Sequence, residues 1–147
     1  RTTLKCYMND TGLLISHAFD EKCIVSSEIY QKLLFGKLEV NEGMLIENIV
    51  AQMLMASGNK LFFYSKSSEE AENRMEIDFL LQKDKVTTRH NIRPLEVKSG
   101  KNYTLSSITK CMKKFGEYMT LPTVLHAADY KVENGIIYLP LYMTPLL

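Results

Sequence analysis

The chain has 147 residues, 46% of them hydrophobic and 24% charged, which is enough for one domain with a core of its own. Eighteen basic and 17 acidic residues give a net charge of +1, so no strong overall field attracts nucleic acid or acidic lipid, and any basic binding surface must be local. No apolar run approaches the about 20 residues of a membrane-spanning helix, and the seven glycines and four prolines exclude a collagen-like chain.

The three cysteines, Cys6, Cys23 and Cys111, are widely spaced and form no C-x-x-C pair. This spacing argues against a disulfide framework or a structural zinc site and favours a protein of the reducing cytoplasm. The three histidines are scattered and match no metal-binding motif, so neither residue type receives a functional role. The chain begins with Arg1, and nothing near it resembles a signal peptide, so we expect a fragment of a longer protein.

The first 40 residues contain two predicted elements. Residues 4–8 fit a short strand, which the sequence Asn-Asp-Thr-Gly at residues 9–12 would end. Residues 27–36 fit a helix with a serine cap and a terminal glycine. We expect residues 1–40 to form a strand-and-helix segment that packs on or links to an upstream domain, and residues 41–147 to form the core domain.

Residues 44–57 predict an amphipathic helix that ends at Gly58, where a left-handed residue commonly closes a helix. Its apolar residues recur at helical spacing: Leu45, Ile46, Ile49, Val50, Met53 and Leu54. Glu47 lies at the edge of this apolar arc. From that position its carboxylate can reach across the surface that the helix covers.

Two predicted strands follow the helix. Residues 61–64 are short and apolar, whereas residues 75–81 alternate between apolar and polar positions. The alternation predicts that three apolar residues of the second strand share one face: Ile77, Phe79 and Leu81. Its two acidic residues, Glu76 and Asp78, are predicted to share the opposite face.

Residues 92–98 predict a third strand with the same alternation. Leu95 and Val97 are expected on one face, and Glu96 and Lys98 on the other. The two charged residues would then lie about 6.6 Å apart along the strand.

A second helix is predicted over residues 104–119, with apolar residues on one side and lysines on the other. Residues 123–127 fit a fourth strand, and Asn134-Gly135 before the apolar residues 136–139 is a hairpin signal. The order of helix, three strands, helix and strand (αβββαβ) predicts an α/β fold with a mixed central sheet flanked by helices.

The candidate site consists of Asp78, Glu96 and Lys98, with Glu47 as a fourth member. If the second and third strands pair, Asp78 can lie beside Glu96. Two carboxylates about 4 Å apart repel by roughly 4 kcal/mol at an effective dielectric constant near 20, and a divalent cation would turn that repulsion into binding. Hard oxygen ligands suit Mg²⁺ or Mn²⁺. Lys98 could orient the attacking water or neutralise charge on a phosphoryl group.

The pattern of an acid two residues before a lysine occurs three times, starting at Asp20, Glu96 and Asp129. Only the pair of Glu96 and Lys98 lies on an apolar strand that follows another strand with a same-face aspartate. This setting, and not the pattern alone, selects Glu96 and Lys98.

Three segments resemble the PD-(D/E)xK nuclease superfamily: GMLIENIV at residues 43–50, EIDFLL at 76–81 and PLEVKSG at 94–100. The similarity is closer to the restriction-endonuclease-like domain of unknown function at the C-terminus of a large family of prokaryotic AAA+ ATP-binding proteins. Residues 4–13 and 135–141 resemble the two ends of that domain.

The resemblance implies a restriction-endonuclease-like core that hydrolyses nucleic-acid phosphodiesters with Mg²⁺ or Mn²⁺ as cofactor. It implies catalytic roles for Asp78, Glu96, Lys98 and Glu47, with the three acids as metal ligands. It also implies an upstream AAA+ ATPase domain of the same protein as a partner. ATP would bind only there, because this chain has no G-x-x-x-x-G-K-[ST] motif.

Two simpler interpretations of the charged residues remain open. Glu96 and Lys98 could form a cross-strand ion pair on a solvated face, without chemistry. The lysines of the second helix could be a solvated face, or they could contact a phosphate backbone together with Lys101. These helix lysines are Lys110, Lys113 and Lys114.

Two further functions therefore compete with catalysis. One is a non-catalytic nucleic-acid-binding or regulatory module that keeps the fold and uses the lysines. The other is an interaction module that docks on the upstream ATPase through its apolar terminal segments, including residues 139–147.

Overall fold

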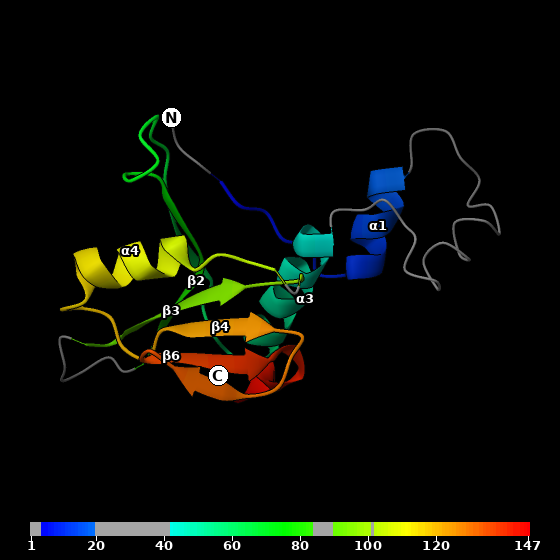
Figure 1. The fold of residues 1–147 in the computed structure, drawn as a ribbon. Coiled ribbons are helices and arrows are strands. Elements are labelled where there is room, and N and C mark those ends of the chain that lie inside the picture. Colours follow the sequence, from blue (N-terminus) through cyan, green and yellow to red (C-terminus); the bar gives the residue numbers. More distant parts are fainter. Residues whose placement is uncertain (1–3, 20–41, 84–89, 101) are drawn as a thin grey trace.

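The structure is a computed structural model that describes residues 4–19, 42–83, 90–100 and 102–147 (Figure 1). The helix predicted over residues 27–36 lies outside the described residues. Cys23 and Lys101 lie outside them as well.

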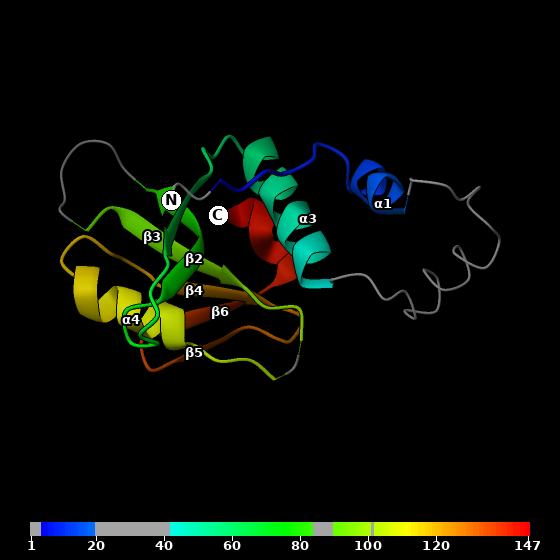
Figure 2. The ribbon, with the colours of Figure 1, turned by 90° about the horizontal axis from the view of Figure 1, so that it is seen from above.

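One six-stranded mixed sheet forms the centre of the molecule (Figures 1 and 2). Its strands are β1 (Phe62–Lys66), β2 (Met75–Gln82), β3 (Ile92–Val97), β4 (Thr123–His126), β5 (Lys131–Glu133) and β6 (Ile136–Pro140). They lie in the order β1-β2-β3-β4-β6-β5. The first three are antiparallel, β3, β4 and β6 are parallel, and β5 is an antiparallel edge strand.

Helices cover both faces of the sheet (Figures 1 and 2). These elements are α1 (Thr11–Phe19), α3 (Glu42–Ala56), α4 (Ser106–Phe115) and the 3-10 helix η1 (Leu141–Leu146). α3 and η1 lie on one face and α4 on the other, while α1 lies beside α3, away from the sheet (Figure 2). The predicted α/β fold with a mixed, helix-flanked sheet is confirmed, and α3, β1, β2, β3, α4 and β4 follow the predicted order.

Two hydrophobic clusters fill the two sides of the sheet. The cluster under α3 contains Val50, Ala51, Leu54, Phe79, Leu81, Leu95, Leu125 and Leu139. The cluster under α4 contains Met75, Ile77, Ile108, Cys111, Met119, Val124, Ile136 and Tyr138. Because both faces are covered, the central strands are buried on both sides, as the consecutive buried residues of β4 show.

The alternation predicted for residues 75–81 is wrong at one point. Tyr64 of β1 pairs with Ile77, but Phe62 pairs with Leu80, so two steps along β1 match three along β2. This β-bulge inserts one residue into β2 and changes the face to which the following side chains point. Ile77 and Leu80 therefore pack under α4, while Phe79 and Leu81 pack under α3.

The N-terminal segment also differs from the prediction. Residues 4–8 form no strand, and residues 9–12 do not end one. Instead α1 begins there, because the Asp10 carboxylate accepts a hydrogen bond from the Leu13 amide at 3.0 Å, in the manner of a helix N-cap.

In the second half of the chain, the predicted helix over residues 104–119 differs from the structure at both of its ends. α4 is shorter than expected, since Met119 forms a parallel bridge with Ile92 instead of continuing the helix. Asn134 and Gly135 have positive φ angles of 50° and 75° and form the expected hairpin turn between β5 and β6.

The C-terminal segment is mostly core and not the free apolar surface expected for docking. Leu141, Met143 and Leu147 pack against the cluster under α3. Only Tyr142 and Leu146 remain exposed as large apolar side chains there. Within the described ranges, no helix combines the length and the apolar composition of a membrane span.

The bulge generates a testable pair of substitutions. Phe79→Ala removes a fully buried ring and is expected to lower the free energy of unfolding by about 3–5 kcal/mol, because it leaves a cavity under α3. Phe62→Ala is the matched control, since this β1 ring is half exposed, and it is expected to cost about 0.5 kcal/mol or less. Urea denaturation measures both values. Equal losses for the two variants would contradict the assignment of Phe79 to the core.

Candidate active site

Three carboxylates meet at the ammonium group of Lys5. Lys5 Nζ lies 2.9 Å from Glu76, 3.0 Å from Glu47 and 3.2 Å from Asp78. Glu47 extends from α3, and the other two extend from β2. We refer to Glu47, Glu76 and Asp78 as the acidic cluster.

Asp78 lies where β2 and β3 separate. The paired register of the two strands ends at Phe79 and Leu95. Beyond it, Asp78 Oδ2 accepts a hydrogen bond from the Val97 amide at 2.9 Å, while Oδ1 faces Lys5. The side chain thus takes the place of a backbone hydrogen bond, which leaves its carboxylate in the fork between the strands.

Burial raises the pKa of the Asp78 carboxyl above its ordinary value. The hydrogen bond from Val97 opposes this rise, the charge of Glu47 adds to it, and Lys5 opposes it. Burial by itself would lower the pKa of Lys5, but the carboxylates of the acidic cluster raise it. Lys5 is therefore a cation at neutral pH.

Glu96 is the most buried acidic side chain of the described residues, with 1% of its surface exposed. It lies on the α4 side of the sheet, because its two neighbours on β3, Leu95 and Val97, pack with the cluster under α3 and side chains alternate along a strand. Burial, and next the charge of Glu96, raise the pKa of Cys111 to about 11. Lys98 Nζ lies 2.8 Å from Glu96 Oε2 but is not aligned for a hydrogen bond. Within the described residues, neither carboxylate oxygen of Glu96 has an aligned donor.

The interpretation of Glu96 and Lys98 as an ion pair on a solvated face is wrong for the acid. The two side chains do pair, but Glu96 is buried and only Lys98 reaches solvent, with 24% of its side chain exposed. Burial raises the pKa of Glu96, Lys98 lowers it, and the charge of Asp78 raises it further.

The structure divides the predicted site into two ion-paired groups and does not bring its four residues together around one point. Glu47 and Asp78 share one cation, Lys5, and Glu96 pairs with Lys98. Among the described residues, no three acidic, histidine or cysteine side chains are placed to hold one metal ion. The reason is the bulge, which directs Asp78 toward α3 while Glu96 lies under α4.

The side chains of the site nevertheless carry the type of ligand atom that a hard divalent cation prefers, although they are not arranged around one point. The carboxylates of the acidic cluster already converge on one positive charge, and Glu96 has oxygens that lack hydrogen bonds. Carboxylate oxygens are the ligands that Mg²⁺ and Mn²⁺ prefer. Metal binding by Glu47, Asp78 and Glu96 stays a prediction.

Sequence reasoning missed the residues that hold the N-terminal segment at this site. The Tyr7 hydroxyl donates a hydrogen bond to Glu47 Oε1 at 2.6 Å, and its ring lies 5.5 Å from that of Phe79. Burial and the contact with Glu47 raise the pKa of Tyr7, so its hydroxyl keeps its proton. The only available signal was that residues 4–13 carry part of the family resemblance.

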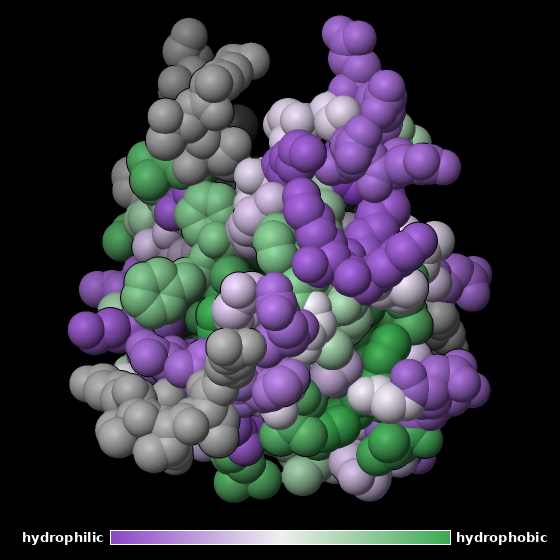
Figure 3. Space-filling view, turned by 90° about the vertical axis from the view of Figure 1, so that its left-hand side faces the viewer, coloured by the Kyte–Doolittle hydropathy of each residue, from purple (hydrophilic) through white to green (hydrophobic). Residues whose placement is uncertain are grey.

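The predicted basic surface is divided. Lys110 donates hydrogen bonds to the carbonyl groups of Ala71 and Arg74, at 2.6 and 3.2 Å, and so holds the loop before β2. Lys113 and Lys114 are exposed. Hydrophilic side chains cover much of the side of the molecule on which α4 lies (Figure 3).

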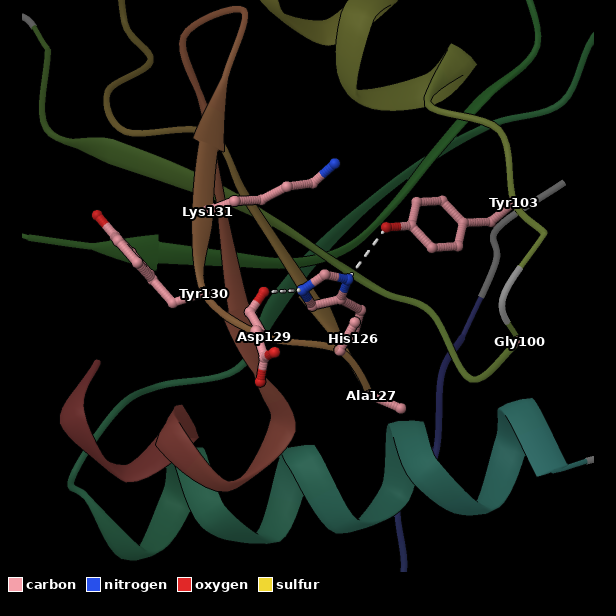
Figure 4. A pocket seen from close by; sticks show the side chains of 8 residues that line it. Gly100, Tyr103, His126, Ala127, Asp129, Tyr130 and Lys131 are labelled. Carbon is pink, nitrogen blue, oxygen red and sulfur yellow. Dashed lines mark hydrogen bonds between the residues drawn. The ribbon is translucent and has the colours of Figure 1, made fainter.

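A hollow separate from the acidic cluster lies at the carboxyl ends of β3 and β4, with a volume of about 470 Å³ (Figure 4). The buried His126 lines it, and its ring joins the Tyr103 hydroxyl at 3.2 Å to the Asp129 carbonyl at 3.0 Å. Because a carbonyl only accepts, Nε2 carries the proton toward Asp129 and Nδ1 accepts from Tyr103. Both ring nitrogens are satisfied, so His126 has a structural role.

The burial of Glu96 predicts a pH dependence of stability. A raised pKa means that the folded state binds the Glu96 proton more tightly than the unfolded chain does. The unfolding free energy of the wild type therefore falls as pH rises above the ordinary value of about 4.5. Glu96→Gln cannot ionise and is expected to be more stable than the wild type at pH 8, by about 1–3 kcal/mol. This advantage shrinks as the pH falls toward 4.5.

Urea denaturation with EDTA present, at both pH values, measures this difference. Glu133→Gln is the control, because Glu133 forms an exposed ion pair with Lys131, and a small, pH-independent change is expected. An advantage of Glu96→Gln that is the same at both pH values would contradict the assignment.

Comparison with protein families matches residues 42–143 to the family described as "Domain of unknown function (DUF4143)". The chain matches no curated protein and no solved structure. The matched range contains α3, the whole sheet and α4, and with them Glu47, Asp78, Glu96 and Lys98. Because it covers more than half of the chain, the chain belongs to the DUF4143 family.

Proposed function

We propose that this domain hydrolyses nucleic-acid phosphodiester bonds with Mg²⁺ or Mn²⁺ held at the fork between β2 and β3. One observation carries the proposal: Glu96 is buried, its oxygens lack aligned hydrogen-bond donors, and the Lys98 ammonium group lies 2.8 Å from one of them. A buried carboxylate whose hydrogen bonds are incomplete is costly for stability. Such a group is retained where a proton or a cation completes it, which is the situation of a metal ligand.

The residues of the site divide the proposed work among them. Glu96, Asp78 and Glu47 would hold the cation, which when bound supplies Lewis acidity to a phosphoryl oxygen. The Lys98 ammonium group contacts the buried acid and also reaches solvent, so it can neutralise charge that develops on the phosphoryl group. The Val97 amide keeps the Asp78 carboxylate in place.

The element order and the resemblance of residues 76–81 and 94–100 support a restriction-endonuclease-like core for this domain. The same resemblance supports an upstream AAA+ ATPase domain as its partner in a cytoplasmic protein, with ATP bound in that partner. Both statements belong to the proposal.

The proposal is tested by incubating the purified chain with DNA and with RNA at millimolar Mn²⁺ or Mg²⁺. The wild type is expected to cleave one of them, and EDTA is expected to stop cleavage. Glu96→Gln and Lys98→Met are expected to lower the rate about 100-fold or more, since each removes charge stabilisation at the reacting phosphate.

The chain offers a matched control pair. Lys131 and Glu133 are also two residues apart on one strand and form an ion pair at 2.7 Å, but both are exposed. Lys131→Met and Glu133→Gln are expected to cleave like the wild type. Absence of cleavage by the wild type, or equal residual cleavage by all five proteins, would rule out catalysis by this site.

A non-catalytic nucleic-acid-binding or regulatory module is the second candidate. The observation that favours it is that Lys5 already places a positive charge among the three carboxylates of the acidic cluster, at the point that a metal ion would otherwise occupy. The exposed Lys113 and Lys114 would then contact phosphates, whereas Lys110 is engaged with the loop before β2.

This candidate predicts salt-dependent binding without a metal requirement. The double variant Lys113→Glu/Lys114→Glu is expected to bind a fluorescent DNA or RNA oligonucleotide more weakly and to reduce the slope of log K against log salt by about 2, one unit for each lost phosphate contact. Fluorescence anisotropy in EDTA measures both. Binding that is unchanged by the double charge reversal would contradict this candidate.

A further inference from the structure

The hollow at the carboxyl ends of β3 and β4 has the position and the size of a ligand pocket (Figure 4). We refer to it as the strand-end hollow. Ligands of open α/β sheets commonly bind just outside the carboxyl ends of the parallel strands. The volume of about 470 Å³ lies within the range of about 300–1,000 Å³ that is typical of small-molecule pockets. None of its lining residues takes part in the proposed catalysis.

Backbone pairing places the strand-end hollow beside Lys98. The parallel pairing of β3 and β4 reaches Val97 and Leu125, and the Lys98 amide continues it by donating to the Leu125 carbonyl at 2.8 Å. Lys98 therefore lies level with His126, one strand away, and neighbouring strands are about 4.8 Å apart. Gly100, which also lines the hollow, follows shortly after Lys98 in the chain.

The strand-end hollow and Lys98 also lie on the same side of the sheet. Lys98 contacts Glu96, which lies on the α4 side. The His126 ring lies 5.6 Å from that of Tyr138, and Tyr138 belongs to the cluster under α4. Tyr103, which lines the hollow, packs against the same cluster. A phosphate group at the Lys98 ammonium group would therefore lie next to the hollow.

One aromatic ring of the strand-end hollow is fixed in place. The Tyr103 hydroxyl donates to His126 Nδ1 at 3.2 Å, and the two rings meet at 78° with their centroids 6.4 Å apart. His126 is itself held by the Asp129 carbonyl at 3.0 Å. Tyr130 also borders the hollow, but its ring points away from Tyr103 and His126 (Figure 4). Tyr103 is therefore the ring on which a flat ligand can stack, and it is ordered before the ligand binds.

The rest of the lining leaves room and favours an uncharged ligand. Lys131 borders the hollow, but its ammonium group pairs with Glu133 at 2.7 Å, so we assign it no contact with a ligand. Asp129 is acidic, which disfavours a phosphate group inside the hollow. A phosphate attached to the ligand would therefore be left to Lys98. The remaining lining residues are small: Gly100, Ala127 and Ala128.

We infer that the strand-end hollow receives the base of an unpaired nucleotide whose phosphate lies at Lys98. This inference rests on the proposed function and specifies its substrate class, a single strand or an unpaired region of nucleic acid. A base inside a duplex is stacked and paired, so it reaches a pocket only by leaving the helix, at a cost in free energy that an unpaired base avoids. Stacking on Tyr103 suits any base, because every base has a flat face. The hollow therefore distinguishes unpaired from paired nucleotides and not one sequence from another.

The test compares two single strands that carry the same phosphates. Fluorescence anisotropy in EDTA measures binding of the purified chain to a labelled single strand and to a strand of the same length from which every base is missing. The wild type is expected to bind the strand with bases at least about 5-fold more tightly, which is the effect of one stacked base. Both DNA and RNA strands are measured, and equal affinity for the two strands in both cases would overturn the inference.

Two substitutions locate the effect in the hollow. Tyr103→Ala removes the stacking ring and is expected to weaken binding of the strand with bases by about 5-fold to 150-fold, without a change for the strand that lacks them. Gly100→Leu is expected to act in the same direction, because its side chain narrows the hollow. The backbone accepts this side chain, since Gly100 has no positive φ and a Cβ atom there would meet no other atom within 4 Å.

Tyr142→Ala is the matched tyrosine control. Its ring is 75% exposed on η1, on the other side of the sheet, and the variant is expected to bind both strands like the wild type. Gly100→Leu keeps the test decisive if Tyr103→Ala does not fold. A preference for bases that is unchanged in the folded variants would overturn the inference, as would an equal loss of affinity for both strands.

The remaining outcomes separate the hollow from the proposed catalysis. An unchanged preference for bases in the variants, together with metal-dependent cleavage by the wild type, would overturn the hollow alone. A wild type that cleaves nothing but loses its preference for bases in Tyr103→Ala and Gly100→Leu would overturn the proposed function and support the hollow as a base site. Displacement of the strand by a free nucleoside monophosphate, at a concentration near the dissociation constant of the strand, would assign the hollow to a free nucleotide and overturn the inferred substrate class.

Discussion

The hydrogen bond between the Val97 amide and the Asp78 carboxylate determines the layout of the site. It lies where β2 and β3 stop pairing, immediately next to the bulge in β2. A backbone amide at such a separation must find another acceptor, because burying it without one is costly. Asp78 accepts the hydrogen bond of this amide with one oxygen, and its other oxygen faces the Lys5 ammonium group. The same side chain therefore completes the hydrogen bonding of the sheet and contributes a carboxylate oxygen to the site.

The charges around this fork are balanced locally. Lys5 pairs with the three carboxylates of the acidic cluster on the α3 side, and Lys98 faces Glu96 on the α4 side. The two lysines differ in how they reach the sheet, since Lys98 directly follows β3 and Lys5 belongs to a segment that side chains of α3 hold. The sheet therefore positions one ammonium group, and contacts between the N-terminal segment and α3 position the other.

The comparison of Glu96 with Glu133 illustrates why the surroundings of a motif matter more than its spacing. Both acids pair with a lysine two residues away in the sequence. Glu133 is exposed on an edge strand, where water screens its charge and the pair contributes little. Glu96 is buried between the sheet and α4, where the same pair leaves carboxylate oxygens without hydrogen bonds and shifts the pKa.

The sequence by itself determined the fold class, the order of elements from α3 to β4, the hairpin at Asn134 and the positions of the four charged residues on their elements. These follow from local periodicity and turn chemistry, which need no knowledge of distant contacts. Only the tertiary structure decided that the bulge separates Asp78 from Glu96 and that Lys5 lies within the acidic cluster. A bulge depends on how two strands pair, and the contact between Lys5 and Asp78 joins residues 73 positions apart, so neither leaves a periodic trace in the sequence.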